Sequence, residues 1–267
     1  MNVRKGLKTV LIAAVVGVSV GALLGAGIPA LKKFGRADLG DELDKMPAYR
    51  DMYAEAVDTC AGDCQFDRKS AQTLVLSGRI RAKTYEAFMR NVDGRVTEIV
   101  VNSVGGGVEP ALKIAEEIER RGLRVVVQGY CLSSCANYLF LAGREKAIRG
   151  ILGYHGGVQA LHRELVASGK NPPCGVCATE KAFFARVGVS EKLFDITQSR
   201  NKGFTRGVSM YVPSAATLRA LGVRNIVGDQ NEQLLRLSSN LYERTQEGFF
   251  AFGRDPNPEI MELLNRR

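Results

Sequence analysis

The chain has 267 residues, enough for one sizeable α/β domain with appendages, because a core of ordinary size takes roughly 100–200 residues. Hydrophobic residues make up 45% of the chain and charged residues 24%, which excludes wholesale disorder and a multi-span membrane protein. The formal net charge of +9 comes largely from six cations that precede the first acidic residue, so we predict no nucleic-acid-binding surface.

An uncharged stretch, residues 9–31, follows the first basic cluster and predicts a single transmembrane helix. As a helix it would reach about 35 Å, the thickness of a bilayer core with some excess. The basic residues before it predict a cytoplasmic amino terminus, with the rest of the chain on the periplasmic side of the inner (cytoplasmic) membrane. A cleaved signal peptide is an alternative, although its apolar region is usually about 7–15 residues long and Ile28-Pro29-Ala30 is a poor cleavage site. A buried core helix is another.

Six cysteines form three close pairs in the sequence: Cys60 and Cys64, Cys131 and Cys135, Cys174 and Cys177. An even number of cysteines in an exported chain predicts disulfides, but six allow 15 connectivities and the sequence does not choose among them. Two of the short pairs could instead form a zinc site, and the CxxC pair could be a redox motif. We predict disulfides, with no metal and no cofactor.

Four regions are predicted along the chain: an anchor or signal segment over 1–36, a linker or cap over 37–69, an α/β domain over 70–228 and a helical extension over 229–267. The domain begins with strands over 73–77, 96–101 and 123–127, and with helices over 83–91, 108–121 and 134–142. Turns at 102–107 and 129–132 separate these elements. The alternation of strands and helices predicts a parallel sheet.

The second half of the domain is predicted to be mostly helical. One or two strands are expected over 147–154, helices over 158–168, 178–187 and 215–221, and a last strand over 223–227. Gly222 is the expected end of the last of these helices.

Three of the turns carry small or nucleophilic residues: Asn102-Ser103-Val104-Gly105-Gly106, then Gly129 to Gly143 with two adjacent serines, then Gly153-Tyr154-His155. In this order, and over roughly residues 74–227, the chain resembles the proteolytic subunit of the Clp protease. Val104 stands where that family has proline. The resemblance implies an α/β fold of the ClpP/crotonase type, a spiral of β-β-α units, here behind an N-terminal transmembrane helix.

A serine nucleophile needs a base to take its proton and amide donors to hold the developing oxyanion, and a helix N-terminus can supply such donors. Counting back from Gly143 matches Ser134 to the nucleophile of the family, whereas counting forward from Gly129 matches Ser133. We choose Ser134, because the helix that follows the nucleophile is the more constrained element. The resemblance then assigns the amides of Gly106 and Cys135 to the oxyanion hole. Serines that only cap a helix are the alternative without chemistry.

His155 is the candidate base, because it leaves a strand and precedes two glycines, whereas His162 lies within an amphipathic helix and is expected at the surface. The third member of the family's triad is missing. Its aspartate corresponds to Met210, and Asp195 is only a weak candidate. The sequence therefore predicts either a Ser–His dyad oriented by a hydroxyl or backbone group, or an activity that is low or lost.

The resemblance implies a serine hydrolase, most simply a peptidase acting on peptide or protein in the cell envelope, and a homo-oligomer is compatible with it. The alternative is a catalytically inactive ClpP-like binding or scaffold module. A crotonase-like acyl-CoA enzyme and a cysteine nucleophile fit an exported chain less well. The glycines at 105–107 do not form a phosphate-binding loop, because neither a following Lys-Ser/Thr nor G-x-G-x-x-G is present.

Overall fold

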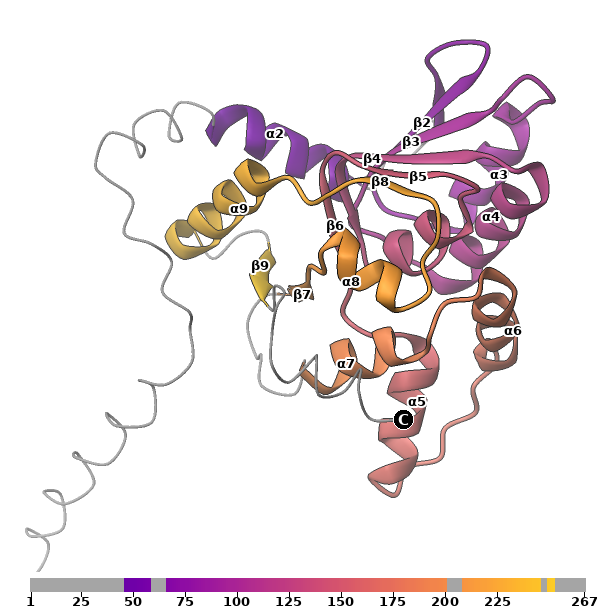
Figure 1. Cartoon of the computed structure of the whole chain (residues 1–267), viewed down its shortest axis with the longest axis vertical. Coiled ribbons are helices and arrows are strands. Elements are labelled where there is room, and N and C mark those ends of the chain that lie inside the picture. The colour runs from indigo at the N-terminus through magenta and orange to yellow at the C-terminus, as the bar shows by residue number, and fades with distance from the viewer. Residues whose placement is uncertain (1–45, 59–65, 201–207, 246–248, 253–267) are drawn as a thin grey trace, which may run out of the picture. The chain divides into compact units, whose positions relative to one another are not determined.

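The computed structural model describes residues 46–58, 66–200, 208–245 and 249–252, all within one compact unit, Asp44–Arg267 (Figure 1). The predicted membrane-spanning stretch 9–31 lies outside these residues. Within them, no helix combines the length and apolar character needed to cross a membrane.

A seven-stranded, mostly parallel sheet forms the centre of the unit, with the order β1-β2-β3-β4-β5-β8 and with β6 also paired to β4. The strands are β1 (Phe66–Arg68), β2 (Thr73–Ser77), β3 (Glu98–Ser103), β4 (Arg124–Leu132), β5 (Lys146–Ile148), β6 (Ile151–Gly153) and β8 (Ile226–Gly228). Only β1 and β2 pair antiparallel in it. The predicted α/β class with a parallel sheet is confirmed. Two further strands, β7 (Val208–Tyr211) and β9 (Phe249–Phe252), pair with each other.

β4 is the longest strand of the sheet, and it leads directly to the two adjacent serines Ser133 and Ser134. Its first half pairs with β5 and its second half with β6, so the turn predicted over 129–132 is wrong and the strand continues to Leu132. Gly129 suggested a turn, but it serves a close approach instead. A Cβ built on Gly129 would lie 2.3 Å from Oδ1 of Asn102, which accepts the N–H of Tyr130 at 3.0 Å. The Asn102 side chain of β3 therefore fits only because β4 has a glycine beside it.

Three helices, α3 (Ala82–Asn91), α4 (Val108–Arg121) and η1 (Cys135–Phe140), contribute to the main hydrophobic core together with the strands. α4 has the predicted bounds, and it ends at Gly122 with φ +63°, as a C-terminal glycine should. η1 is a π-helix whose six residues are all buried. It occupies the middle of the helix predicted over 134–142.

α2 (Met46–Val57) and α9 (Glu232–Thr245) surround a second, smaller core. The tyrosine rings of Tyr49 and Tyr53 in α2 meet Tyr130 of β4 edge-on, with centroids 6.0 and 5.5 Å apart. The stretch predicted as a linker or cap thus contains a helix that packs on the sheet. In the helical extension predicted over 229–267, α9 is a helix as expected, but β9 is a strand, and residues 246–248 and 253–267 lie outside the described residues.

The remaining helices are α5 (Val158–Ala167), α6 (Cys177–Val187), α7 (Lys192–Arg200) and α8 (Ala215–Ala220). The first two and α8 match predicted helices within a few residues. α7, β1, β7 and β9 were not predicted individually, because short elements give weak periodicity.

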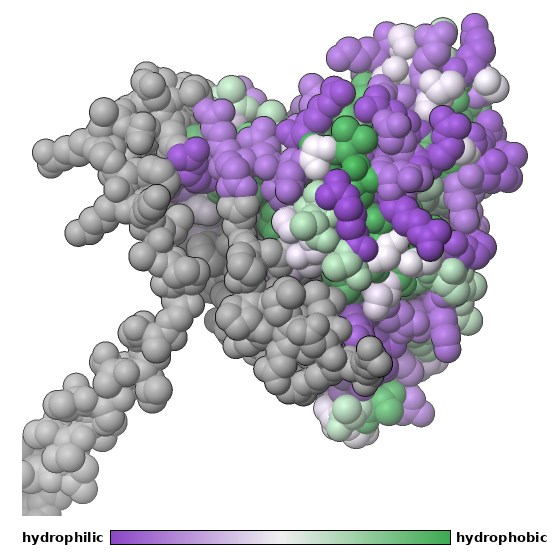
Figure 2. All heavy atoms as spheres, viewed as in Figure 1, coloured by the Kyte–Doolittle hydropathy of each residue, from purple (hydrophilic) through white to green (hydrophobic). Residues whose placement is uncertain are grey.

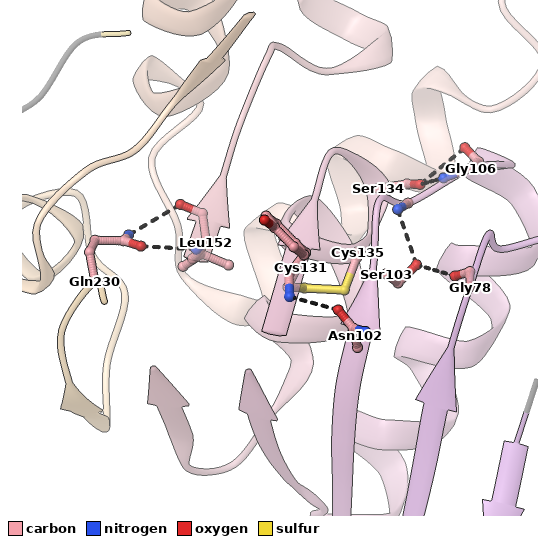
Figure 3. Close-up of a disulfide and its surroundings, with 11 residues drawn as sticks. Gly78, Asn102, Ser103, Gly106, Cys131, Ser134, Cys135, Leu152 and Gln230 are labelled. Atoms are coloured by element: carbon pink, nitrogen blue, oxygen red, sulfur yellow. Dashed lines mark hydrogen bonds between the residues drawn. A yellow bond between two sulfur atoms is a disulfide. The ribbon is translucent and has the colours of Figure 1, made fainter. Parts of the chain in front are cut away.

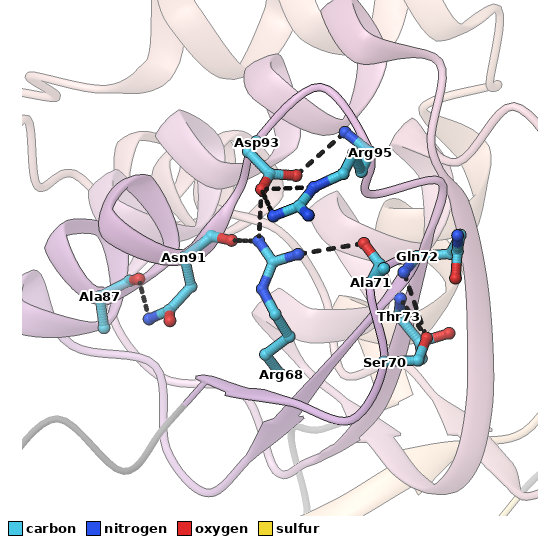
Figure 4. Close-up of polar contacts among 9 residues, drawn as sticks. All are labelled: Arg68, Ser70, Ala71, Gln72, Thr73, Ala87, Asn91, Asp93 and Arg95. Atoms are coloured by element: carbon cyan, nitrogen blue, oxygen red, sulfur yellow. Dashed lines mark hydrogen bonds and ion pairs between the residues drawn. The ribbon is translucent and has the colours of Figure 1, made fainter.

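A cluster of polar contacts ties the β1–β2 hairpin to the end of α3 (Figure 4). The Arg68 guanidinium donates to the carbonyls of Ala71, at 3.0 Å, and Asn91, and it pairs with Asp93 at 3.2 Å. Arg95, the main hydrogen-bond donor to Asp93, lowers the pKa of that carboxyl to about 2. The edge of the sheet is therefore fastened by a charged cluster at the surface.

On the face drawn in Figure 2, apolar atoms of the described residues reach the surface as a narrow strip and small spots among hydrophilic ones. The exposed large apolar side chains of the described part are Met89, Leu161, Val166 and Val227. This distribution is the ordinary one for a core closed by polar side chains.

Candidate functional site

The turn from β4 into η1 places Ser133 in an unusual backbone conformation. Its φ is +56°, in the left-handed region that residues other than glycine rarely adopt. The N–H of Ser133 donates to the carbonyl of Gly153 at 3.0 Å, which fixes the turn against the end of β6. Ser133 is partly accessible, whereas Ser134 is only 3% exposed. A strained, accessible serine between a strand and a helix is a common feature of nucleophilic sites.

His155 follows β6 directly and contacts this serine. The preceding residue, Tyr154, exchanges two backbone hydrogen bonds with Tyr211 of β7, at 2.8 and 2.7 Å, which fixes the start of the loop. Nε2 of His155 lies 2.6 Å from Oγ of Ser133. The structure thus brings the predicted base to Ser133 and not to Ser134.

Ser134 turns the other way, toward the glycine turn after β3 (Figure 3). Its Oγ accepts the N–H of Gly106 at 2.7 Å and lies 3.0 Å from the carbonyl oxygen of Gly106. The left-handed conformation of Ser133 sends the two serine side chains in different directions. The predicted pairing of Ser134 with His155 is therefore wrong. It also follows that the Gly106 amide, assigned by resemblance to the oxyanion hole, is engaged by the hydroxyl of Ser134.

The two glycines of this turn allow it to approach the serines. A Cβ built on Gly105 would lie 2.5 Å from the carbonyl oxygen of Leu132 and 2.9 Å from the amide nitrogen of Ser134. Gly105 and Gly106 also have φ of +84° and +152°. Ser103 fixes the turn to the end of β2: its Oγ donates to the carbonyl of Gly78 at 2.5 Å and accepts the Gly105 N–H at 3.1 Å (Figure 3). The glycine turn is therefore built to lie against the start of η1.

A disulfide between Cys131 and Cys135 encloses both serines, linking the end of β4 to the first residue of η1 (Figure 3). Both cysteines are fully buried. A second disulfide joins Cys174 to Cys177 before α6. The disulfide prediction is confirmed for these two pairs, which removes their thiols as nucleophiles or thiolate ligands in this oxidised state. Cys60 and Cys64 lie outside the described residues.

The described residues bring no group of three or more histidine, cysteine, aspartate or glutamate side chains together in a way that could hold a metal ion.

Burial lowers the pKa of His155 below its ordinary value, while a hydrogen bond between the imidazole and the backbone of the same residue opposes the shift. A lowered pKa keeps the ring neutral at neutral pH. A neutral ring that uses one nitrogen as a donor to the backbone leaves Nε2 as the acceptor for the Ser133 hydroxyl. This is the protonation state that a general base requires.

The remaining candidates do not join the dyad. Met210, where the resembling family has aspartate, is 3% exposed in β7, and its Cβ lies 3.1 Å from a Cβ built on Gly153. A thioether thus lies next to the site where a carboxylate was expected. Asp195 forms an ion pair with Arg163 at 2.5 Å, with half of its side chain exposed. His162 lies in α5, with Nε2 3.0 Å from the carbonyl oxygen of Pro172.

Two polar side chains near the dyad were missed in the sequence, Asn137 and Glu180. Asn137 is buried in η1, and its amide donates to the carbonyl of Gly156, next to His155, at 2.7 Å. Glu180 of α6 is completely buried and accepts hydrogen bonds at the start of α5. A lone amide within the otherwise apolar run Cys135–Ala142 was the available signal for Asn137. Nothing in the helical pattern of α6 distinguishes Glu180 from a solvated residue.

No family model matches the chain, and no curated protein matches it.

Proposed function

We propose that the chain is a serine hydrolase of the ClpP/crotonase-like type, acting on peptide or protein, with Ser133 as nucleophile and His155 as base. One observation carries the proposal, the 2.6 Å separation of Ser133 Oγ and His155 Nε2. The lowered pKa of His155 and the left-handed conformation of Ser133 support it. The spiral form of the fold belongs to the same proposal, supported by the division of β4 between two short parallel partners, β5 and β6.

The mechanism follows from these positions. His155 Nε2 accepts the proton of the Ser133 hydroxyl as Oγ attacks the carbonyl carbon of a peptide or ester. The imidazolium then gives this proton to the leaving amine or alcohol, and water attacks the acyl-enzyme with His155 again as base. The amide of the residue after the nucleophile belongs to Ser134, at the start of the helix, where N–H groups have no helical partner. It replaces the Cys135 amide as the proposed oxyanion donor.

The Ser134 hydroxyl and the Gly106 amide form the other side of this proposed oxyanion hole. In the present state they bond to each other at 2.7 Å. Rotation of the Ser134 side chain would release the Gly106 N–H toward an oxyanion. Ser134 is thus proposed to support the site rather than to attack the substrate.

A fluorophosphonate probe tests the assignment, because it labels an activated serine irrespective of the natural substrate. We expect purified, oxidised protein to be labelled, Ser133→Ala and His155→Ala to abolish the labelling, and Ser134→Ala to retain it. Peptide mapping of the adduct should return Ser133. Labelling that survives in Ser133→Ala but not in Ser134→Ala would overturn the assignment.

A catalytically inactive ClpP-like binding or scaffold module is the second candidate. The presence of Met210 where the resembling family has a carboxylate favours it. Complete absence of labelling in folded, disulfide-intact protein would support this candidate over the hydrolase.

The location of the protein is part of the proposal. Residues 9–31 are proposed to anchor it in the inner membrane with the domain in the periplasm. The two disulfides support an oxidising compartment. Two measurements test this placement: membrane fractionation, and the accessibility of the domain to protease in cells whose outer membrane has been permeabilised.

A further inference from the structure

The dyad raises the question of what holds the imidazole toward Ser133 when Met210 offers no carboxylate. Asn137 lies one helical turn beyond Ser133, and its N–H donates to the Ser133 carbonyl at 2.8 Å. Its side chain is 4% exposed, and its Nδ2 donates to the Gly156 carbonyl at 2.7 Å. One residue thus contacts both the backbone of the nucleophile and the loop that carries the base.

The position of Gly156, the residue of the loop that Asn137 binds, affects the residue next to it, His155. Gly156 has φ of +112°, a conformation that only glycine adopts readily, and its carbonyl is one residue away from His155. Before His155 the loop is fixed by the backbone pair of Tyr154 and Tyr211. Because His155 lies between these two attachments, displacement of Gly156 would rotate the backbone from which the imidazole projects.

The far end of the loop is held from the same helix. The hydroxyl of Tyr138, the residue after Asn137, donates to Oε1 of Glu180 at 2.6 Å. Glu180 in turn accepts the N–H groups of Val158 and Gln159 at 3.1 and 2.8 Å. These are the first two amides of α5, where a carboxylate is favoured by the free N–H groups and the helix dipole. Adjacent residues of η1 thus hold the loop at two points.

We infer that Asn137 is a positioning residue for the dyad: through the Gly156 carbonyl it holds His155 at bonding distance from Ser133. The inference rests on the proposed hydrolase function for its catalytic consequence. Its structural part, the placement of His155, can be measured separately.

Nuclear magnetic resonance gives that separate measurement, because the chain contains only two histidines, His155 and His162. With labelled histidine, the imidazole signals of His155 in the wild type should titrate below the ordinary value of about 6.5, since the ring is largely buried. In Asn137→Ala and in Asn137→Leu, which keeps a similar volume, no side-chain donor reaches Gly156, and the His155 pKa should move up toward 6.5.

The same variants are then treated with the fluorophosphonate probe. We expect the second-order labelling rate to fall about 100-fold, because a misplacement on the order of 1 Å has that effect on a reacting pair. Asn91→Ala is the matched control, since Nδ2 of Asn91 also donates to a carbonyl, that of Ala87 at 2.8 Å, within α3. It should leave both the His155 titration and the labelling rate unchanged.

The outcomes separate the two proposals. A wild type that is not labelled defeats the hydrolase function, whereas the His155 titration still decides the role of Asn137. A folded Asn137 variant with an unchanged His155 pKa and an unchanged labelling rate would overturn the inference. So would loss of the fold in both Asn137 variants, because the contact would then serve stability rather than the position of the base.

Discussion

At the scale of single residues, the burial of His155 determines the pH range in which the proposed hydrolase could work. The imidazole is partly buried and contacts Ser133, and desolvation disfavours its charged form, so its pKa lies below the ordinary value. A histidine acts as a general base only when it is neutral. Below the lowered pKa the ring is protonated and Ser133 loses its proton acceptor.

The labelling rate of the wild type should therefore be flat at neutral pH and fall on the acid side with a midpoint below about 6.5. The measurement is the second-order rate of fluorophosphonate labelling from pH 5 to 9, with the unfolded fraction followed by circular dichroism as a control. A midpoint at or above 6.5 in folded protein would show that the base is not the buried imidazole.

From the sequence, His155 and the two adjacent serines could be identified as candidates, but not which serine contacts the histidine. His155 was identifiable because only two histidines exist and one of them lies in an amphipathic helix. The choice between Ser133 and Ser134 depended on the backbone at Ser133, whose positive φ sends adjacent side chains in different directions. Counting residues along a helix assumes a regular turn, and no residue type in Leu132-Ser133-Ser134 announces a left-handed one.

At the scale of elements, the Cys131–Cys135 disulfide joins the strand that leads to Ser133 with the helix that follows it. The bond closes a loop of only a few residues, for which the loss of unfolded-state entropy amounts to about 2 kcal/mol. Both cysteines are fully buried, so their removal also leaves unfilled space in the core. The bond constrains the one turn in which the geometry of the dyad is set.

We expect Cys131→Ala combined with Cys135→Ala to lower the free energy of unfolding by about 2–4 kcal/mol and to slow labelling of Ser133 at least 10-fold. The double variant Cys174→Ala and Cys177→Ala is the matched control, because its disulfide closes a loop of similar length before α6. It should lose about 2 kcal/mol without slower labelling. Equal labelling rates in the two double variants would contradict a role of the first disulfide at the site.

Helices and strands with strong periodicity were predictable, and elements shaped by tertiary contact were not. α4 was predicted to the residue, because its apolar positions recur at helical spacing and Gly122 ends it. The second half of β4 was not, because Gly129 reads as a turn until Asn102 is known to lie beside it. α2 was not predicted, because it lies in a stretch interpreted as a linker or cap, and its packing depends in part on aromatic rings that meet Tyr130 of β4.

At the scale of the whole molecule, Gln230, which precedes α9, binds the strand β6 that leads to His155. In the pairing of β6 with β4, Leu152 lies opposite Cys131, and both of its backbone groups bond to Gln230. Its Oε1 accepts the Leu152 N–H at 2.9 Å, and its Nε2 donates to the carbonyls of Leu152 and Pro213 at 3.1 and 2.7 Å (Figure 3). The side chain is 7% exposed, so these bonds are shielded from water. A glutamine amide therefore takes the place of a neighbouring strand.

Replacing Gln230 with leucine keeps the approximate volume but leaves the backbone groups of Leu152 and Pro213 without these partners. A buried polar group left unsatisfied costs about 1–3 kcal/mol, so we expect a total loss on the order of 3 kcal/mol. For a unit of this size that corresponds to a fall in Tm of about 5–10 °C. Gln128→Leu, at an exposed position of β4, is the matched control and should shift Tm by no more than about 2 °C. Thermal unfolding followed by circular dichroism measures both Tm values. A Tm for Gln230→Leu within about 1–2 °C of that of the control would show that the stability of β6 does not depend on the glutamine.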